Sequence, residues 1–153
     1  MTSATGSAAG GPAYAGDVSP RQAWDELKAV PKAQLVDVRT RAEWGFVGVP
    51  DLGEIGKEPI LLEWQSFPTM TVSQTFVDDL IETLNALKAG PDDPVYFLCR
   101  SGARSRSAAI ALTAAGYTRC YNVANGFEGP LDAGKHRGSV DGWKAQALPW
   151  MQG

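Results

Sequence analysis

The sequence predicts an α/β fold, in which a central, mostly parallel β-sheet is flanked by helices on both faces. Short runs of β-branched and aromatic residues, typical of buried strands, alternate along the chain with longer segments of helical periodicity. Such alternation favours parallel strands that are joined by helices packed on the sheet. The chain has 153 residues, 44% of them hydrophobic and 20% charged, which suits one domain with a proper core.

The N-terminal segment differs from this pattern. Residues 1–16, MTSATGSAAGGPAYAG, are rich in Gly, Ala and Ser and lack the basic start and apolar core of a secretory signal. We therefore expect a flexible tail over 1–16 and a single folded domain over 17–153. The formal net charge of −3 favours no nucleic-acid partner, no apolar run reaches the length of a membrane span, and a cytoplasmic location is expected.

The first helix is predicted to begin after Ser19. Ser19 suits the N-cap, Pro20 suits the first helical position, and Gln22 completes a capping box. Pro31 should end this helix because proline cannot continue it. Ala23, Trp24 and Leu27 form its apolar face.

Four short apolar runs are predicted as strands, at residues 35–39, 59–64, 95–99 and 120–124. Residues 74–89 have apolar side chains at helical spacing, and Gly90 with Pro91 should end that helix. Residues 105–115 are alanine-rich and predicted as a helix, with Gly116 at its C-terminal end. A short helix is expected over 142–147. Two long glycine-bearing loops, 49–59 and 125–142, are marked as functional or mobile.

The segment FLCRSGARSRSAA, residues 97–109, places a cysteine at the junction of a strand and a helix. Ligands of open parallel sheets bind beyond the carboxyl ends of strands, where the N–H groups and dipole of the next helix favour an anion. Gly102 lets the loop curl so that its amides point inward, while Arg100 and Arg104 add positive charge. We therefore expect Cys99 to be a reactive thiolate rather than an inert buried thiol.

At these residues the chain resembles the rhodanese-like sulfurtransferase family. The active loop of that family has a cysteine, four residues and a basic residue, as in CRSGAR at residues 99–104. LVDVRTRAEW at residues 35–44 is similar to the family's D-V-R-x-x-x-E-aromatic segment. NVANGFEG followed by GWKAQALPW is similar to its closing G-G…W…G-L-P element. The resemblance covers roughly residues 17–150 and implies a single rhodanese-like domain.

Two departures concern the rim of the pocket. The family often carries G-H-I-P-G-A where this chain has VGVPDL at residues 47–52. Gly126 and Trp143 are also further apart than is usual. Because these departures lie at the rim of the pocket, the resemblance does not define the substrate.

The resemblance implies sulfur transfer through a persulfide on Cys99. The donor would be thiosulfate or a related compound, and the acceptor would be cyanide, a small thiol or a protein thiol. The substrate-binding residues are then expected to be Arg100, Ser101, Gly102, Ala103, Arg104 and Ser105, with Arg100 or Arg104 holding a sulfonate. No metal or organic cofactor is implied.

Two other functions stay open. A phosphatase or arsenate reductase would have five residues between cysteine and arginine, but position 105 is serine, so this reading is disfavoured. A sulfur-carrier or protein-interaction module without significant turnover would use the same persulfide.

Residues outside the loop carry weaker expectations. Asp37 is expected to support the site by bonding loop amides or an arginine, or else to be structural. Arg39 and Glu43 are four residues apart and are expected to form a structural ion pair. His136 is predicted to be a solvated loop residue and Cys120 a buried strand cysteine. The last group of residues is expected either to line the pocket above the cysteine loop or to belong to the core. These residues are Trp64, Phe67 and Met70.

Overall fold

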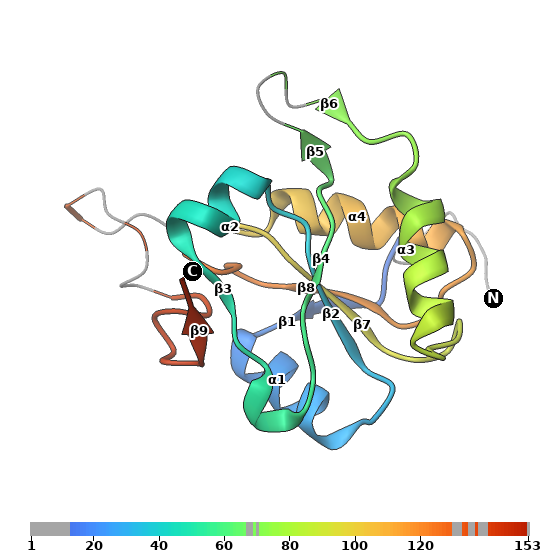
Figure 1. Cartoon of the computed structure of the whole chain (residues 1–153), viewed down its shortest axis with the longest axis horizontal. Coiled ribbons are helices and arrows are strands. Elements are labelled where there is room, and N and C mark those ends of the chain that lie inside the picture. The colour runs from blue at the N-terminus through green and yellow to red at the C-terminus, as the bar shows by residue number, and fades with distance from the viewer. Residues whose placement is uncertain are drawn as a thin grey trace.

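A computed structural model of the chain describes residues 13–66, 69, 71–129, 133–134, 137 and 141–152 (Figure 1). Its centre is a five-stranded sheet with the strand order β1-β8-β7-β2-β4, in which every neighbouring pair is parallel. The strands are β1 (Gly16–Val18), β2 (Gln34–Asp37), β4 (Ile60–Leu61), β7 (Val95–Leu98) and β8 (Cys120–Val123). The predicted α/β class with a parallel sheet is confirmed.

Helices cover both faces of this sheet (Figure 1). They are α1 (Pro20–Ala29), α2 (Arg41–Val47), α3 (Phe76–Ala86) and α4 (Ala103–Ala114). Helix α1 packs on one face, and α3 and α4 pack on the other. Helix α2 follows β2 directly, so it lies at the carboxyl end of the sheet.

Two hydrophobic cores follow from the alternation of side chains along each strand. In β7, Phe97 packs with the α3 and α4 side, while Tyr96 and Leu98 pack with the α1 side. All four residues of β7 are buried, which is typical of a strand covered on both faces. Packing on both faces therefore holds the central strands in place, and the loops at their carboxyl ends are attached to a rigid sheet.

Smaller elements border the sheet. Strand β3 (Val49–Pro50) pairs with β9 (Trp150–Met151) near the C-terminus, and β5 (Gln65–Ser66) pairs with β6 (Thr71–Val72). The 3₁₀ helix η1 (Gly53–Ile55) lies between β3 and β4. The expected long loop 49–59 therefore contains short ordered elements.

Several predicted boundaries are confirmed or corrected. The capping box of Ser19 and Gln22 is present at the start of α1. The second predicted strand is only two residues long, and residues 142–147 form turns rather than a helix. Strand β1 was not expected and begins at Gly16, one residue before the predicted domain boundary. None of the described helices is both long and apolar enough to span a membrane.

Candidate active site

Cys99 follows the buried strand β7 and precedes α4. The residue is only 1% exposed, and the backbone N–H of Gly102 donates a hydrogen bond of 3.1 Å to its Sγ. Gly102 reaches this position with φ of +121°, a conformation that side-chain-bearing residues rarely adopt. The loop turns so tightly that α4 begins at Ala103, two residues before the predicted start. The sulfur therefore lies at the positive end of a helix.

Ser105 contacts the sulfur from the first turn of α4. Its Oγ lies 3.2 Å from Cys99 Sγ and 2.5 Å from Oδ1 of Asn122 in β8. Ser105 is fully buried and Asn122 is 2% exposed. Asn122 was missed from the sequence, although an amide within the apolar strand CYNV was a signal that a buried partner exists.

Arg104 does not extend freely toward the sulfur. Its guanidinium donates two hydrogen bonds to the Glu43 carboxylate, at 2.7 and 2.9 Å, and so joins α4 to α2. Burial alone would raise the pKa of Glu43, but hydrogen bonds from Arg104 and the Thr40 backbone outweigh it and lower the pKa to about 2. Arg104 and Glu43 thus form a lasting ion pair at neutral pH, in which the arginine charge is balanced.

The expected Arg39–Glu43 ion pair is therefore wrong. Thr40 is the N-cap of α2, so Arg39 lies outside the helix and does not share a helical face with Glu43. Arg39 instead points inward, where its Nε and Nη2 donate to Asp37 at 2.9 and 2.6 Å and Nη2 also donates to Gly48 O. Its guanidinium carbon lies 4.2 Å from the centroid of the Phe127 ring.

This buried pair answers the question left open about Asp37. Both Asp37 and Arg39 are fully buried, and their side-chain bonds go to each other and to Gly48. The Arg39 Nη1 atom has no hydrogen-bond partner within the described part of the chain. The pair supports the turn from β2 to α2 and, through α2, the Glu43 carboxylate.

A second loop packs against the cysteine loop from outside. The N–H of Phe127 donates to Cys99 O at 2.8 Å, and the N–H groups of Glu128 and Gly129 donate to Arg100 O at 3.0 and 3.2 Å. A Cβ on Gly126, which has φ of +58°, would lie 2.4 Å from Cys99 O. The 125–142 loop is thus joined to the site through its first residues, a role that the sequence did not reveal.

The other predicted site residues form the exposed side of the loop. Arg100, Ser101 and Ala103 are exposed, whereas Gly102 and Ser105 are buried. Among the six predicted loop residues, Gly102 and Ser105 are the two that form hydrogen bonds with the Cys99 sulfur.

Five remaining candidate residues have the following outcomes. Cys120 is buried as predicted, and burial raises the pKa of its thiol to about 11, so it stays protonated at neutral pH. Trp64 packs against the core next to Phe76, with ring centroids 5.0 Å apart. His136, Phe67 and Met70 lie outside the described residues. Among the residues that the structure describes, no cluster of His, Cys, Asp or Glu is suited to hold a metal.

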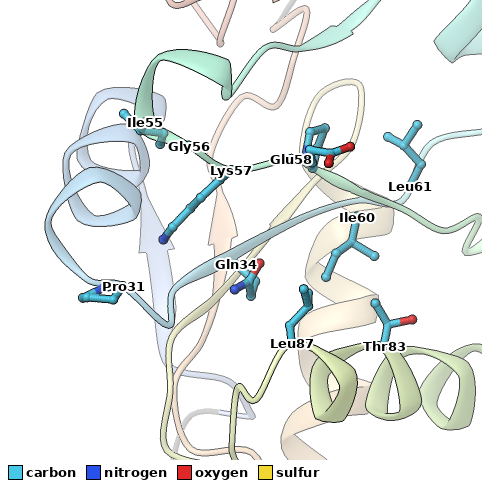
Figure 2. A pocket seen from close by; sticks show the side chains of 11 residues that line it. Pro31, Gln34, Ile55, Gly56, Lys57, Glu58, Ile60, Leu61, Thr83 and Leu87 are labelled. Atoms are coloured by element: carbon cyan, nitrogen blue, oxygen red, sulfur yellow. The ribbon is translucent and has the colours of Figure 1, made fainter.

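A groove of about 940 Å³ lies elsewhere on the molecule (Figure 2). Its lining includes Gln34, which begins β2, and Leu87, which follows α3. Because Cys99 follows the other end of the parallel strands, the groove is separate from the cysteine loop. Lys57 of this groove donates to the carbonyls of Val30 and Ala33 at 2.8 and 2.7 Å, so its charge supports the end of α1.

Comparisons with known proteins agree with this architecture. Residues 15–153 match the family described as STR4 middle domain. Uncharacterized protein RC0915 of Rickettsia conorii is 39% identical over 130 residues, which cover 85% of this chain and 92% of that protein. Rhodanese-like domain-containing protein 4, chloroplastic, of Arabidopsis thaliana is 25% identical over 138 residues, which cover 88% of this chain and 25% of that protein.

Two solved structures are also similar. The crystal structure of Rv0390 from M. tuberculosis is 51% identical, with a TM-score of 0.81, and the match covers 92% of this chain and 99% of that chain. The polysulfide-sulfur transferase homodimer from Wolinella succinogenes is 23% identical, with a TM-score of 0.55 and coverage of 90% and 78%. The second likeness concerns the fold alone.

Proposed function

Because the chain belongs to the STR4 middle domain family and has a rhodanese-like fold, we propose that it is a sulfurtransferase with Cys99 as nucleophile. It moves a sulfane sulfur from a donor such as thiosulfate to cyanide, a small thiol or a protein thiol. The observation that carries the proposal is the position of the Cys99 sulfur, which accepts the Gly102 N–H at the N-terminal end of a twelve-residue helix.

The burial of Cys99 limits the donor. At 1% exposure, the cysteine accepts only a slender reactant that enters the loop end-on, and a terminal sulfur atom fits this requirement. The loop runs from Cys99 to Arg104, one residue shorter than the resemblance implies for a phosphatase or arsenate reductase. Sulfur chemistry is therefore favoured over phosphate chemistry.

The two arginines of the loop, Arg100 and Arg104, have different surroundings and therefore different proposed roles. Arg104 is engaged by Glu43, whereas Arg100 is exposed and follows the nucleophile directly. We expect Arg100 to attract the anionic end of the donor, and Arg104 to hold α2 against the loop. This assignment narrows the earlier expectation that either arginine holds a sulfonate.

The reaction has two steps. The Cys99 thiolate attacks the outer sulfur of thiosulfate, the S–S bond of the donor breaks, and sulfite leaves with the electron pair. The product is a Cys99 persulfide, whose terminal sulfur carries the negative charge. Cyanide or a thiolate then attacks that terminal sulfur, and Cys99 leaves as thiolate. The positive end of α4 stabilises the anion in both steps.

The proposal is tested by the intact mass of the protein after incubation with thiosulfate. One sulfur atom should be added, cyanide should remove it, and Cys99→Ser should not acquire it. Cys120→Ser is the matched control and should still be loaded, because the Cys120 thiol is buried and protonated. An adduct that persists in Cys99→Ser would disprove the assignment.

The turnover rate distinguishes an enzyme from a sulfur-carrier module. Multiple turnovers with thiosulfate and cyanide support an enzyme, whereas single loading without turnover points to a carrier. Cys99-dependent hydrolysis of an aryl phosphate would instead identify a phosphatase.

A further inference from the structure

The Ser105 hydroxyl has more acceptors around it than it has protons. Its Oγ lies 2.5 Å from Asn122 Oδ1, 3.2 Å from Cys99 Sγ and 3.2 Å from Gly102 O. A serine hydroxyl donates one hydrogen bond and accepts two. Only one of these neighbours can receive the proton at a time, and the shortest distance favours Asn122.

The orientation of the Asn122 amide is fixed from its other side. Its Nδ2 donates to Asp17 Oδ1 at 3.0 Å, and the phenol of Tyr14 donates to the same oxygen at 2.9 Å. A carboxylate only accepts hydrogen bonds, so a flipped amide would place two acceptors against each other. Asp17 thereby directs the Asn122 carbonyl toward Ser105.

This arrangement suits an uncharged Cys99 sulfur. While the Ser105 hydroxyl donates its hydrogen bond to Asn122, it presents a lone pair to Cys99 Sγ. A thiol can donate to this lone pair, whereas a thiolate is repelled by it. The inner sulfur of a persulfide also carries no formal charge. The Ser105 proton must therefore turn from Asn122 to Sγ when the thiolate forms, and it can return when the sulfur is transferred.

We propose that Asn122, held by Asp17, is a positioning residue that competes with Cys99 for the Ser105 proton. The inference rests on the proposed function and adds to it that Asn122 controls the reactivity of the Cys99 nucleophile. Because the Ser105 proton reaches Sγ only by giving up its bond to Asn122, Asn122 weakens the hydrogen bond from Ser105 to the thiolate. A more weakly bonded sulfur is more nucleophilic, and the persulfide is favoured over the free thiolate. Loss of the Asn122 carbonyl should leave the thiolate more stable and less reactive.

Several charged and titratable groups surround the Cys99 sulfur, and the test requires that their charges do not change. Arg104 on α4 is paired with Glu43 on α2, and Asp37 is paired with Arg39 after β2. Arg100 is exposed beside the nucleophile, and Asp17 and Tyr14 come from the N-terminal edge of the sheet. Substitution of Asn122 by an uncharged residue changes none of these charges.

The test is the rate of Cys99 alkylation by iodoacetamide against pH in the Cys120→Ser background. In Asn122→Leu the midpoint of the profile should move to lower pH by about one unit, the effect expected of one added hydrogen bond to a charged sulfur. The limiting rate at high pH should fall several-fold. In Ser105→Ala the midpoint should move upward, and adding Asn122→Leu to that variant should cause no further shift.

Asp17→Ala provides a second route because Asp17 is exposed and its loss leaves the buried residues in place. Freed from Asp17, the Asn122 amide can turn, so the midpoint should again fall, and only when Ser105 is present. Asp25→Ala, the same charge change at an exposed position of α1, controls for net charge and should leave the midpoint unchanged.

Two results would overturn the inference. One is an unchanged midpoint in both Asn122→Leu and Asp17→Ala, and the other is a shift that persists without Ser105. Alkylation needs no sulfur donor, so this outcome is independent of whether the protein transfers sulfur.

Discussion

At the scale of single residues, Glu43 sets how much positive charge the cysteine loop offers a substrate. Its carboxylate accepts two hydrogen bonds from Arg104 and also completes the capping box with Thr40. One side chain therefore starts α2 and balances the charge of the loop arginine. Arg100 is left as the unpaired cation next to Cys99 among the described contacts.

Glu43→Gln should release the Arg104 charge while keeping α2 intact, because glutamine serves equally well in a capping box. We expect the second-order rate constant for persulfide formation from thiosulfate, a dianion, to rise about tenfold. The rate should also decrease more steeply with ionic strength than in the wild type. Both are measured by rapid quench and intact mass.

Glu58→Gln removes the same charge at the separate groove of Figure 2 and is the matched control. An equal increase in this control would assign the effect to net charge. A decrease in Glu43→Gln would mean that the pairing with Glu43 is needed to place Arg104.

At the scale of elements, the turn after β8 holds the cysteine loop through backbone groups. Gly126 allows this contact because it has φ of +58° and no side chain where Cys99 O and Arg100 approach. Phe127 continues the contact and packs its ring on Arg39. The turn therefore connects the nucleophile with the buried pair at the end of β2.

Gly126→Ala should be strongly destabilising. A left-handed conformation costs an alanine about 1–2 kcal/mol, and here a Cβ would also collide with Cys99 O at 2.4 Å. Gly56→Ala is a matched control, because Gly56 has φ of +71° and nothing lies within 4 Å of its added Cβ. Urea denaturation should show a loss of about 1 kcal/mol for Gly56→Ala and a clearly larger loss for Gly126→Ala. Equal losses would mean that the turn moves away from the loop without cost.

The sequence predicted those elements whose signals are local. Helix α1 has its cap and its apolar face within ten residues, and Gly102 between a strand and a helix marks the cysteine loop. Strand β1 was missed because its three residues are ordered by pairing with β8, more than one hundred positions away. Residues 142–147 resemble a helix in periodicity, but their contacts with the 125–129 turn hold them in turns.

The candidate site shows the same division. The nucleophile, the loop glycine and the arginines follow from one continuous motif, whereas Glu43 and Asn122 contact it from two other elements, and Asp17 bonds to Asn122 from a third. Spacing along the chain suggested that Glu43 pairs with Arg39. Only the arrangement of β2, α2 and α4 in space shows that Arg104 takes that place.

At the scale of the whole molecule, the ion pairs link folding to ionisation. Arg104 and Glu43 join elements that are sixty-one residues apart, and the pair forms only when α2 and α4 meet at the edge of the sheet. Asp37 and Arg39 are fully buried and cannot lose one partner without leaving the other charge unpaired. Protonation of Glu43 should therefore weaken the contact between α2 and α4 at the carboxyl end of the sheet.

The free energy of unfolding should reflect this through Glu43. Its pKa is lowered from 4.5 to about 2 in the folded protein because the hydrogen bonds from Arg104 and Thr40 outweigh the opposing effect of burial. A lowered pKa contributes stability that is fully present above the unfolded value and is lost as pH falls toward the folded value. The difference in unfolding free energy between the wild type and Glu43→Gln should thus be constant near neutral pH. It should shrink between about pH 5 and pH 2, as followed by urea denaturation monitored by tryptophan fluorescence. A difference that stays constant down to pH 2 would show that Glu43 titrates in the folded protein as it does in the unfolded chain, and that the Arg104 pair adds no pH-dependent stability.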